Sequence, residues 1–152
     1  MLFRSRRYVL PFSTELVQLL QTTKVPVIYF GTDTATLLPA MKETGAEVIG
    51  VDWRIPLDQA WSDLQFQGAV QGNLDPVLLF AEQKELLARA DSILRQAAGR
   101  PGHIFNLGHG ILPETPVDNV IALVDFVKQA NAKYSLPPAE GVERKRKQGA
   151  TR

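Results

Sequence analysis

A histidine between two glycines is the residue of this chain best placed to do chemistry. His109 follows the stretch 104–107, in which residues 104, 105 and 107 are apolar, and it stands between Gly108 and Gly110. The apolar stretch predicts a short buried strand, and the glycines allow positive φ or a close approach of the backbone to a ligand. An imidazole can donate, accept or carry a proton near neutral pH. His109 is therefore the first functional candidate, and a loop histidine bonded to a carbonyl is the alternative.

Further polar side chains stand where other strands are expected to end. Asp52 could hold a substrate N–H group or orient a base, or it could cap the next helix. Asn73 and Asp75 are typical of a turn into a proline-started helix, with one of them as the cap. If the strands are parallel, these residues meet at one rim of the sheet together with Asn106 and His109. His103 lies at the opposite end of its strand, and we expect a structural role for it.

The elements that position these residues alternate along the chain. Apolar runs predict strands over residues 25–30, 47–53, 68–71 and 104–107. Helical spacing predicts helices over residues 13–22, 35–44, 55–64, 76–98 and 117–129, with a break near Glu82 and a Ser13–Thr14 cap on the first helix. Four strand–loop–helix units with short links indicate an α/β fold with parallel strands and right-handed crossovers.

Composition limits the classes of function. The chain has 152 residues and no cysteine, so disulfides and thiolate chemistry are excluded, which fits a cytoplasmic location. No apolar run predicts a membrane span, and no signal peptide is expected at the basic start of the chain. Residues 134–152 contain Pro137-Pro138 and, after them, a run rich in Lys and Arg, which predicts a disordered basic tail. We expect no nucleic-acid partner, because no aromatic residue accompanies that charge.

Three motifs resemble, in this order along the chain, the C-terminal half of uroporphyrinogen decarboxylase. They are Val51-Asp52-Trp53, Gln71-Gly72-Asn73-Leu74-Asp75-Pro76 and Asn106-Leu107-Gly108-His109-Gly110. Leu10-Pro11 and residues 28–31 match the same family, so the resemblance covers about residues 3–129. By this resemblance residues 1–133 are the C-terminal portion of a (β/α)8 (TIM-type) barrel domain.

The resemblance implies a reaction and a site. The family removes carboxyl groups from the acetate side chains of uroporphyrinogen, giving coproporphyrinogen for haem, without a metal or an organic cofactor. It usually forms a homodimer. His109 matches a substrate-contacting histidine, whereas Asp52, Asn73 and Asp75 match positions of the scaffold and rim. Asn106 belongs to the same rim.

The family's other substrate-binding groups precede the part that this chain matches. We therefore expect a truncated or split chain with about four of the eight barrel units, inactive alone, whose partner is an N-terminal half or a second copy. A half barrel leaves both sheet edges unpaired and one sheet face uncovered. Two alternatives remain at this point. One is a non-catalytic fragment or binding module of the same fold, and the other is a related cobalamin or thiol methyltransferase.

Overall fold

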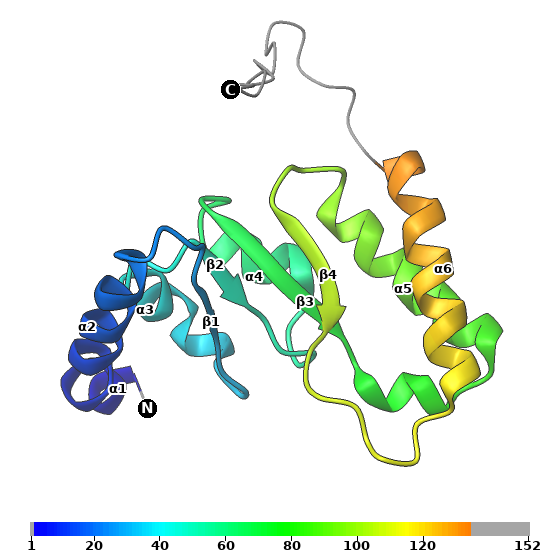
Figure 1. The fold of residues 1–152 in the computed structure, drawn as a ribbon, viewed down its shortest axis with the longest axis horizontal. Helices are drawn as coiled ribbons and strands as arrows, with labels where there is room; N and C mark the ends of the chain where they lie inside the picture. Colours follow the sequence, from blue (N-terminus) through cyan, green and yellow to red (C-terminus); the bar gives the residue numbers. More distant parts are fainter. Residues whose placement is uncertain (1, 135–152) are drawn as a thin grey trace, which may run out of the picture.

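The computed structural model describes residues 2–134, which form one open parallel sheet with helices around it (Figure 1). The strands are β1 (Ile28–Phe30), β2 (Val48–Gly50), β3 (Ala69–Leu74) and β4 (His103–Leu107). The α-helices are α1 (Leu2–Tyr8), α2 (Leu10–Gln21), α3 (Leu38–Lys42), α4 (Leu57–Asp63), α5 (Gln83–Ala97) and α6 (Val117–Tyr134). Two 3₁₀ turns, η1 (Ala35–Leu37) and η2 (Pro76–Phe80), precede α3 and α5.

The strands lie in chain order, β1-β2-β3-β4, and each neighbouring pair is parallel. Figure 1 shows α1, α2 and α3 beyond β1, α5 and α6 beyond β4, and α4 behind the sheet. The predicted parallel α/β arrangement, a partial (β/α)8 barrel, is confirmed. It follows from strands linked by segments of more than ten residues, which must return to the same end of the sheet.

The register divides the sheet into two different faces. One straight row across the strands is Tyr29–Ile49–Val70–His103, and the next is Phe30–Gly50–Gln71–Ile104. Because successive strand residues point to opposite faces, these rows belong to opposite sides. We call the side of the first row the helix face and that of the second row the open face.

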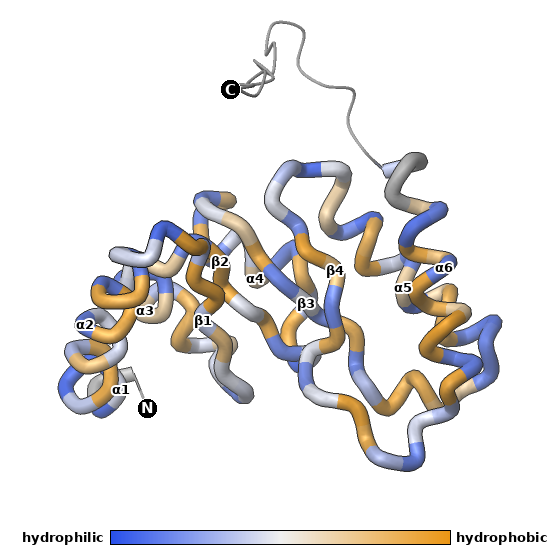
Figure 2. The backbone as a smooth tube through the Cα atoms, in the orientation of Figure 1, coloured by the Kyte–Doolittle hydropathy of each residue, from blue (hydrophilic) through white to orange (hydrophobic). Residues whose placement is uncertain are grey.

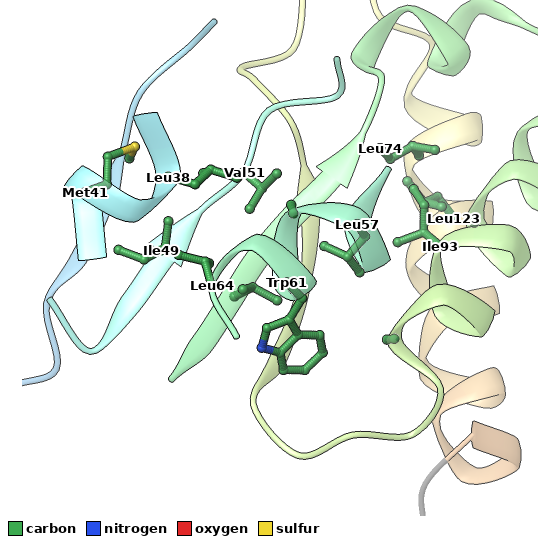
Figure 3. Close-up of a cluster of buried hydrophobic side chains, with 14 of the residues drawn as sticks. Leu38, Met41, Ile49, Val51, Leu57, Trp61, Leu64, Leu74, Ile93 and Leu123 are labelled. Carbon is green, nitrogen blue, oxygen red and sulfur yellow. The ribbon is translucent and has the colours of Figure 1, made fainter. Parts of the chain in front are cut away.

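The helix face carries the core. Val70 and Leu57 are fully buried, and Trp61 is 1% exposed. Figure 3 shows core side chains from the sheet and from the helices around it, running from α3 past α4 to α5 and α6; the labelled ones are Met41, Leu38, Ile49, Val51, Leu64, Leu57, Trp61, Leu74, Ile93 and Leu123. Burial of these side chains is the main stabilisation of the described fold.

The open face and the sheet edges remain apolar at the surface. Phe30 is 45% exposed and Ile104 is 43% exposed. At the β1 edge, Phe12 of α2 is 71% exposed, and at the β4 edge Val117 of α6 is 69% exposed. Figure 2 shows apolar residues along both of these outer helices. Exposed apolar surface of this extent is characteristic of an interaction surface.

Several expected boundaries were wrong. The first helical region begins earlier, as α1 and α2, and Leu10 with Pro11 opens α2 in place of a Ser13–Thr14 cap. The Thr14 hydroxyl donates to the Leu10 carbonyl, and Ser13 contacts the Tyr29 hydroxyl. The Thr14 side chain therefore bonds within α2 and the Ser13 side chain bonds to β1, and no side chain caps the start of α2.

The strands also differ in length from the prediction. β1 and β2 are shorter than residues 25–30 and 47–53, whereas β3 runs on to Leu74, through residues expected to form a turn. The expected break near Glu82 is confirmed between η2 and α5. The last helix reaches Tyr134, and the rest of the expected tail, residues 135–152, lies outside the described residues. Within residues 2–134 no helix is long and apolar enough to cross a membrane.

Candidate functional site

The carboxyl ends of β2, β3 and β4 are tied together at one rim of the sheet. The Asn73 amide is buried and donates to the carbonyls of Asp52, at 2.9 Å, and Ile55, at 2.7 Å. The amide of Gly108 donates to the Leu74 carbonyl at 2.7 Å. Asn73 was expected in a turn or a cap, and it instead anchors the loop after β2. The convergence of polar residues at one rim is confirmed.

Gly108 is needed for the fit of the β4 loop against the β2 loop. A Cβ atom at this position would overlap the backbone nitrogen of Trp53 and lie 3.0 Å from the carbonyl carbon of Asp52. Neither Gly108 nor Gly110 has positive φ, and a Cβ at Gly110 would meet nothing within 4 Å. The expected close approach at Gly108 is therefore to the protein's own backbone.

The His109 side chain is exposed beside this contact between the β4 and β2 loops. Its ring lies edge-to-face against Trp53, with ring centroids 5.9 Å apart. A pocket of about 450 Å³ opens over the end of the sheet, lined by His109 and by open-face residues that include Phe30, Gln71 and Asn106. The imidazole therefore faces a cavity large enough for a small organic ligand.

Asp52 is buried, and its side chain bonds to the loop after β1 and to the loop after β2. Its carboxylate accepts hydrogen bonds from the backbone amides of Asp33 and Arg54, and the Arg54 guanidinium pairs with it at 2.8 Å. The guanidinium also lies over the Trp53 ring, 4.0 Å from its centroid. Asp52 does not cap α4, whose first residues follow Pro56. Through Arg54 it supports the Trp53 ring, against which the His109 ring lies.

The remaining rim candidates have local roles. The Asp75 side chain accepts a hydrogen bond from the Val77 amide at 3.0 Å and so caps η2. Of the two expected caps, Asn73 and Asp75, it is therefore Asp75 that serves. Asn106 lines the pocket, and its side-chain oxygen accepts from the Leu107 amide at 2.9 Å. Asp75 lies outside the lining of the His109 pocket, whereas Asn106 remains a ligand candidate.

His103 lies at the other end of β4. Its Nε2 atom is 2.9 Å from the Gly72 carbonyl, to which it donates, and its ring packs near Trp61. Burial lowers the pKa of His103, and the hydrogen bond to Gly72 opposes that shift. The half-buried, neutral ring thus packs beside the core, in line with the expected structural role.

Two functional features were missed in the sequence. Arg54 is bound to Asp52 and stacked on Trp53, although only its position after the Val51-Asp52-Trp53 motif could have drawn attention to it. Gln71 was quoted only as part of a motif, yet it lines the His109 pocket. Among residues 2–134 no three His, Asp or Glu side chains gather as a metal site.

Comparison with known proteins supplies the family. The sequence profile of uroporphyrinogen decarboxylase matches residues 4–130. Proteins named uroporphyrinogen decarboxylase from Koribacter versatilis, Solibacter usitatus and Chloroflexus aurantiacus are 69%, 50% and 54% identical to this chain over 87%, 81% and 87% of its length. The chain spans only 38%, 36% and 37% of those relatives. With its parallel strands and the His109 rim, the chain belongs to the uroporphyrinogen decarboxylase family.

Proposed function

We propose that this chain is the histidine-bearing C-terminal part of a cofactor-independent decarboxylase that acts on uroporphyrinogen. The observation that carries the proposal is the pocket of about 450 Å³ in which His109, from the family's Gly-His-Gly turn, meets the open face of the sheet. The name of the relatives gives the substrate and the reaction. Removal of carboxylate from the acetate arms turns uroporphyrinogen into coproporphyrinogen, a step toward haem.

The chemistry suits a site without a bound cofactor. A proton added to the pyrrole carbon next to the one that carries the acetate arm makes the ring electron-poor. The electron pair of the breaking carbon–carboxylate bond then forms an exocyclic double bond to the ring, and carbon dioxide leaves. A proton added to the exocyclic carbon gives the methyl group, and loss of the first proton from the ring carbon restores the pyrrole. The protein must orient the carboxylates and manage the protons. His109 fits the first task, because an imidazole N–H can donate to a carboxylate oxygen.

The proposal includes a partner, the preceding part of a uroporphyrinogen decarboxylase chain. β1 and β4 are the edges of the described sheet, and exposed apolar side chains flank both of them. A groove of about 360 Å³ runs between β4 and α6, lined by Phe105, Leu107, Val120 and Val124 among others. The relatives are more than twice as long as the matched region, so they contain enough chain to pair with both edges.

We also place the assembled protein in the cytoplasm. The sequence has no cysteine, and its fold has no disulfide to maintain. Fractionation of cells that produce the tagged chain tests this placement directly.

Co-expression with the preceding part of the Koribacter relative tests the activity. That relative is 69% identical over the shared region, so its other part should fit the same edges. We expect the chain alone to form no coproporphyrinogen from uroporphyrinogen and the co-purified pair to form it. His109→Ala should lower the rate of the pair at least about tenfold, the scale of one lost charge-assisted hydrogen bond.

The matched control is Glu114→Ala, an exposed change in the same loop outside the His109 pocket. It should leave the rate unchanged. A pair that co-purifies without activity would identify a binding module that keeps the fold. Turnover by the chain alone would contradict the need for a partner. Light scattering on the chain alone shows whether a second copy covers the open edges instead.

A further inference from the structure

The Arg54 side chain is held in one place by two neighbours, although it lies at the surface. Its Nη1 atom donates to the Asp52 carboxylate at 2.8 Å, and the guanidinium lies over the Trp53 ring, 4.0 Å from the ring centroid. An arginine fork is flat, so it can pair with a carboxylate and stack on an indole at the same time. The backbone amide of Arg54 donates to the same carboxylate at 3.0 Å. The main chain and the side chain of Arg54 are therefore both anchored to Asp52.

Burial of Asp52 makes this ion pair persistent. The Asp52 side chain is 1% exposed, whereas that of Arg54 is 44% exposed. A pair of two exposed groups contributes little, but a buried carboxylate is poorly solvated and depends on its partners. Among residues 2–134, Arg54 is the only cation that pairs with Asp52, and the other donors to the carboxylate are backbone amides. We therefore expect the guanidinium to remain on the Trp53 ring.

Trp53 connects this anchored cation to the His109 ring. The imidazole lies at 86° to the indole, with ring centroids 5.9 Å apart. The backbone before His109 fits against the same residue, since a Cβ at Gly108 would lie 3.0 Å from the Cβ of Trp53. Within the described part of the chain no hydrogen bond reaches the His109 ring. In this chain the orientation of the imidazole therefore depends on the indole, and the position of the indole depends on Arg54.

We infer that Arg54 is a positioning residue for His109. With Asp52 it holds the Trp53 indole, and the indole holds the imidazole in the orientation in which it meets a carboxylate arm of the ligand. The inference rests on the proposed function for the identity of that ligand. An imidazole that is ordered before the ligand arrives does not have to be ordered by it, so the ion pair at Asp52 raises the affinity of the His109 pocket.

Nuclear magnetic resonance of the ligand-free chain tests the positioning. The sequence has two histidines, so His109→Ala assigns the ring signals of both. The ring current of Trp53 shifts the His109 ring protons, and Trp53→Ala gives their value without that shift. Arg54→Ala should move the His109 signals toward this value and leave those of His103 unchanged.

Two further variants complete the series. Arg54→Lys keeps a cation for the buried Asp52 and so protects the fold, but it provides no flat group for the indole. It should move the His109 signals in the same direction as Arg54→Ala. The matched control is Arg89→Ala, an exposed arginine on α5 that lines the cavity of about 330 Å³ beside Arg54. This change should leave the signals of both histidines in place.

Kinetics of the pair formed with the preceding part of the Koribacter relative test the consequence. Arg54→Lys should raise KM for uroporphyrinogen about fivefold, the scale of ordering one side chain on binding, and change kcat less than about twofold. In a His109→Ala background it should cause no further rise, because Arg54 acts through His109. A rise that persists in that background would show that Arg54 contacts the ligand itself or supports another group, and it would overturn the inference.

The ligand-free spectra separate this inference from the proposed function. If the wild-type pair forms no coproporphyrinogen, the proposed reaction fails, and the His109 signals still decide the positioning. If the pair is active but the His109 signals do not respond to Arg54→Lys, the reaction stands and the positioning fails. Equal shifts of the His103 signals would indicate a general loosening of the fold and would also contradict the positioning.

Discussion

The two faces of the sheet are built from adjacent residues of the same strands, yet they differ completely in their surroundings. On the helix face Val70 is fully buried beneath the surrounding helices, whereas in the next row across the sheet the side chains of Phe30 and Ile104 are nearly half exposed. The helix face is fully covered and forms a packed hydrophobic core. The open face is an apolar surface without a covering layer in residues 2–134.

The rim lies between these extremes. Its backbone is locked by Asn73, Gly108 and the buried Asp52, while the His109 ring that it presents is exposed. A rigid support with an exposed functional group is the arrangement expected of a binding site. This chain therefore stabilises its rim by itself, whereas the open face of the sheet beside the rim is left to be covered.

The largest predicted effect contrasts a core aromatic residue with one on the open face. Trp61→Ala should lower the free energy of unfolding of the chain by about 3–5 kcal/mol, because it leaves a cavity in a packed core. Phe30→Ala should cost about 1 kcal/mol or less in the chain alone, since its ring is already half in water. Urea denaturation followed by circular dichroism measures both values.

The same pair of variants sharpens the contrast in the assembled protein. If the preceding part of the family chain covers the open face, the cost of Phe30→Ala should rise in the pair, while that of Trp61→Ala should not. Equal costs for the two variants in the chain alone would mean that the open face is already covered, for example by a second copy.

A smaller effect distinguishes the two glycines of the rim. Gly108→Ala should destabilise the chain by about 2 kcal/mol, because the added methyl group would overlap the Trp53 backbone and force the loops apart. It should also weaken ligand binding by the pair, since His109 follows directly. Gly110→Ala has open space around it and should change neither quantity. Equal stability of the two variants would show that the rim is less tightly packed than described.

The smallest effect is a pH dependence that comes from the helix face. Burial lowers the pKa of His103, so the unfolded chain binds a proton more readily than the folded chain. The stability contributed by neutral His103 is therefore fully present above the ordinary histidine pKa, about 6.5, and is lost as the pH falls below it. Unfolding midpoints in urea should decrease from pH 7.5 to pH 5.5.

His103→Gln should reduce that decrease, and the same titration of His109→Ala controls for the second histidine. The lowered pKa values of Glu43, bonded to Arg6, and Glu47, bonded to the Val27 amide, act in a different window. Their contribution is present above the ordinary glutamate pKa and is lost only at more acidic pH. A midpoint that stays constant between pH 7.5 and pH 5.5 would contradict the neutral state of the half-buried His103 ring.

Much of the order of elements could be read from local patterns. The alternation of apolar strands with helical spacing predicted the parallel α/β arrangement, the break near Glu82 and a cap at the turn before Pro76, which Asp75 provides. The Gly108-His109-Gly110 turn was identified from three consecutive residues. Such features depend on hydrogen bonds and side-chain contacts within one or two turns of chain, so neighbouring residues determine them.

Tertiary structure decided how these pieces meet. Asn73 was expected to serve its own turn, and it instead holds a loop 18 and 21 residues away. Gly108 was expected to leave room for a ligand, and it instead leaves room for the Trp53 backbone. The edge-to-face contact of Trp53 with His109 had no sequence signal, nor did the Gln71 side-chain oxygen, which lacks a hydrogen-bond partner within residues 2–134. These features arise from strand register and loop packing, which bring together residues far apart in the chain, and so the sequence pattern alone could not determine them.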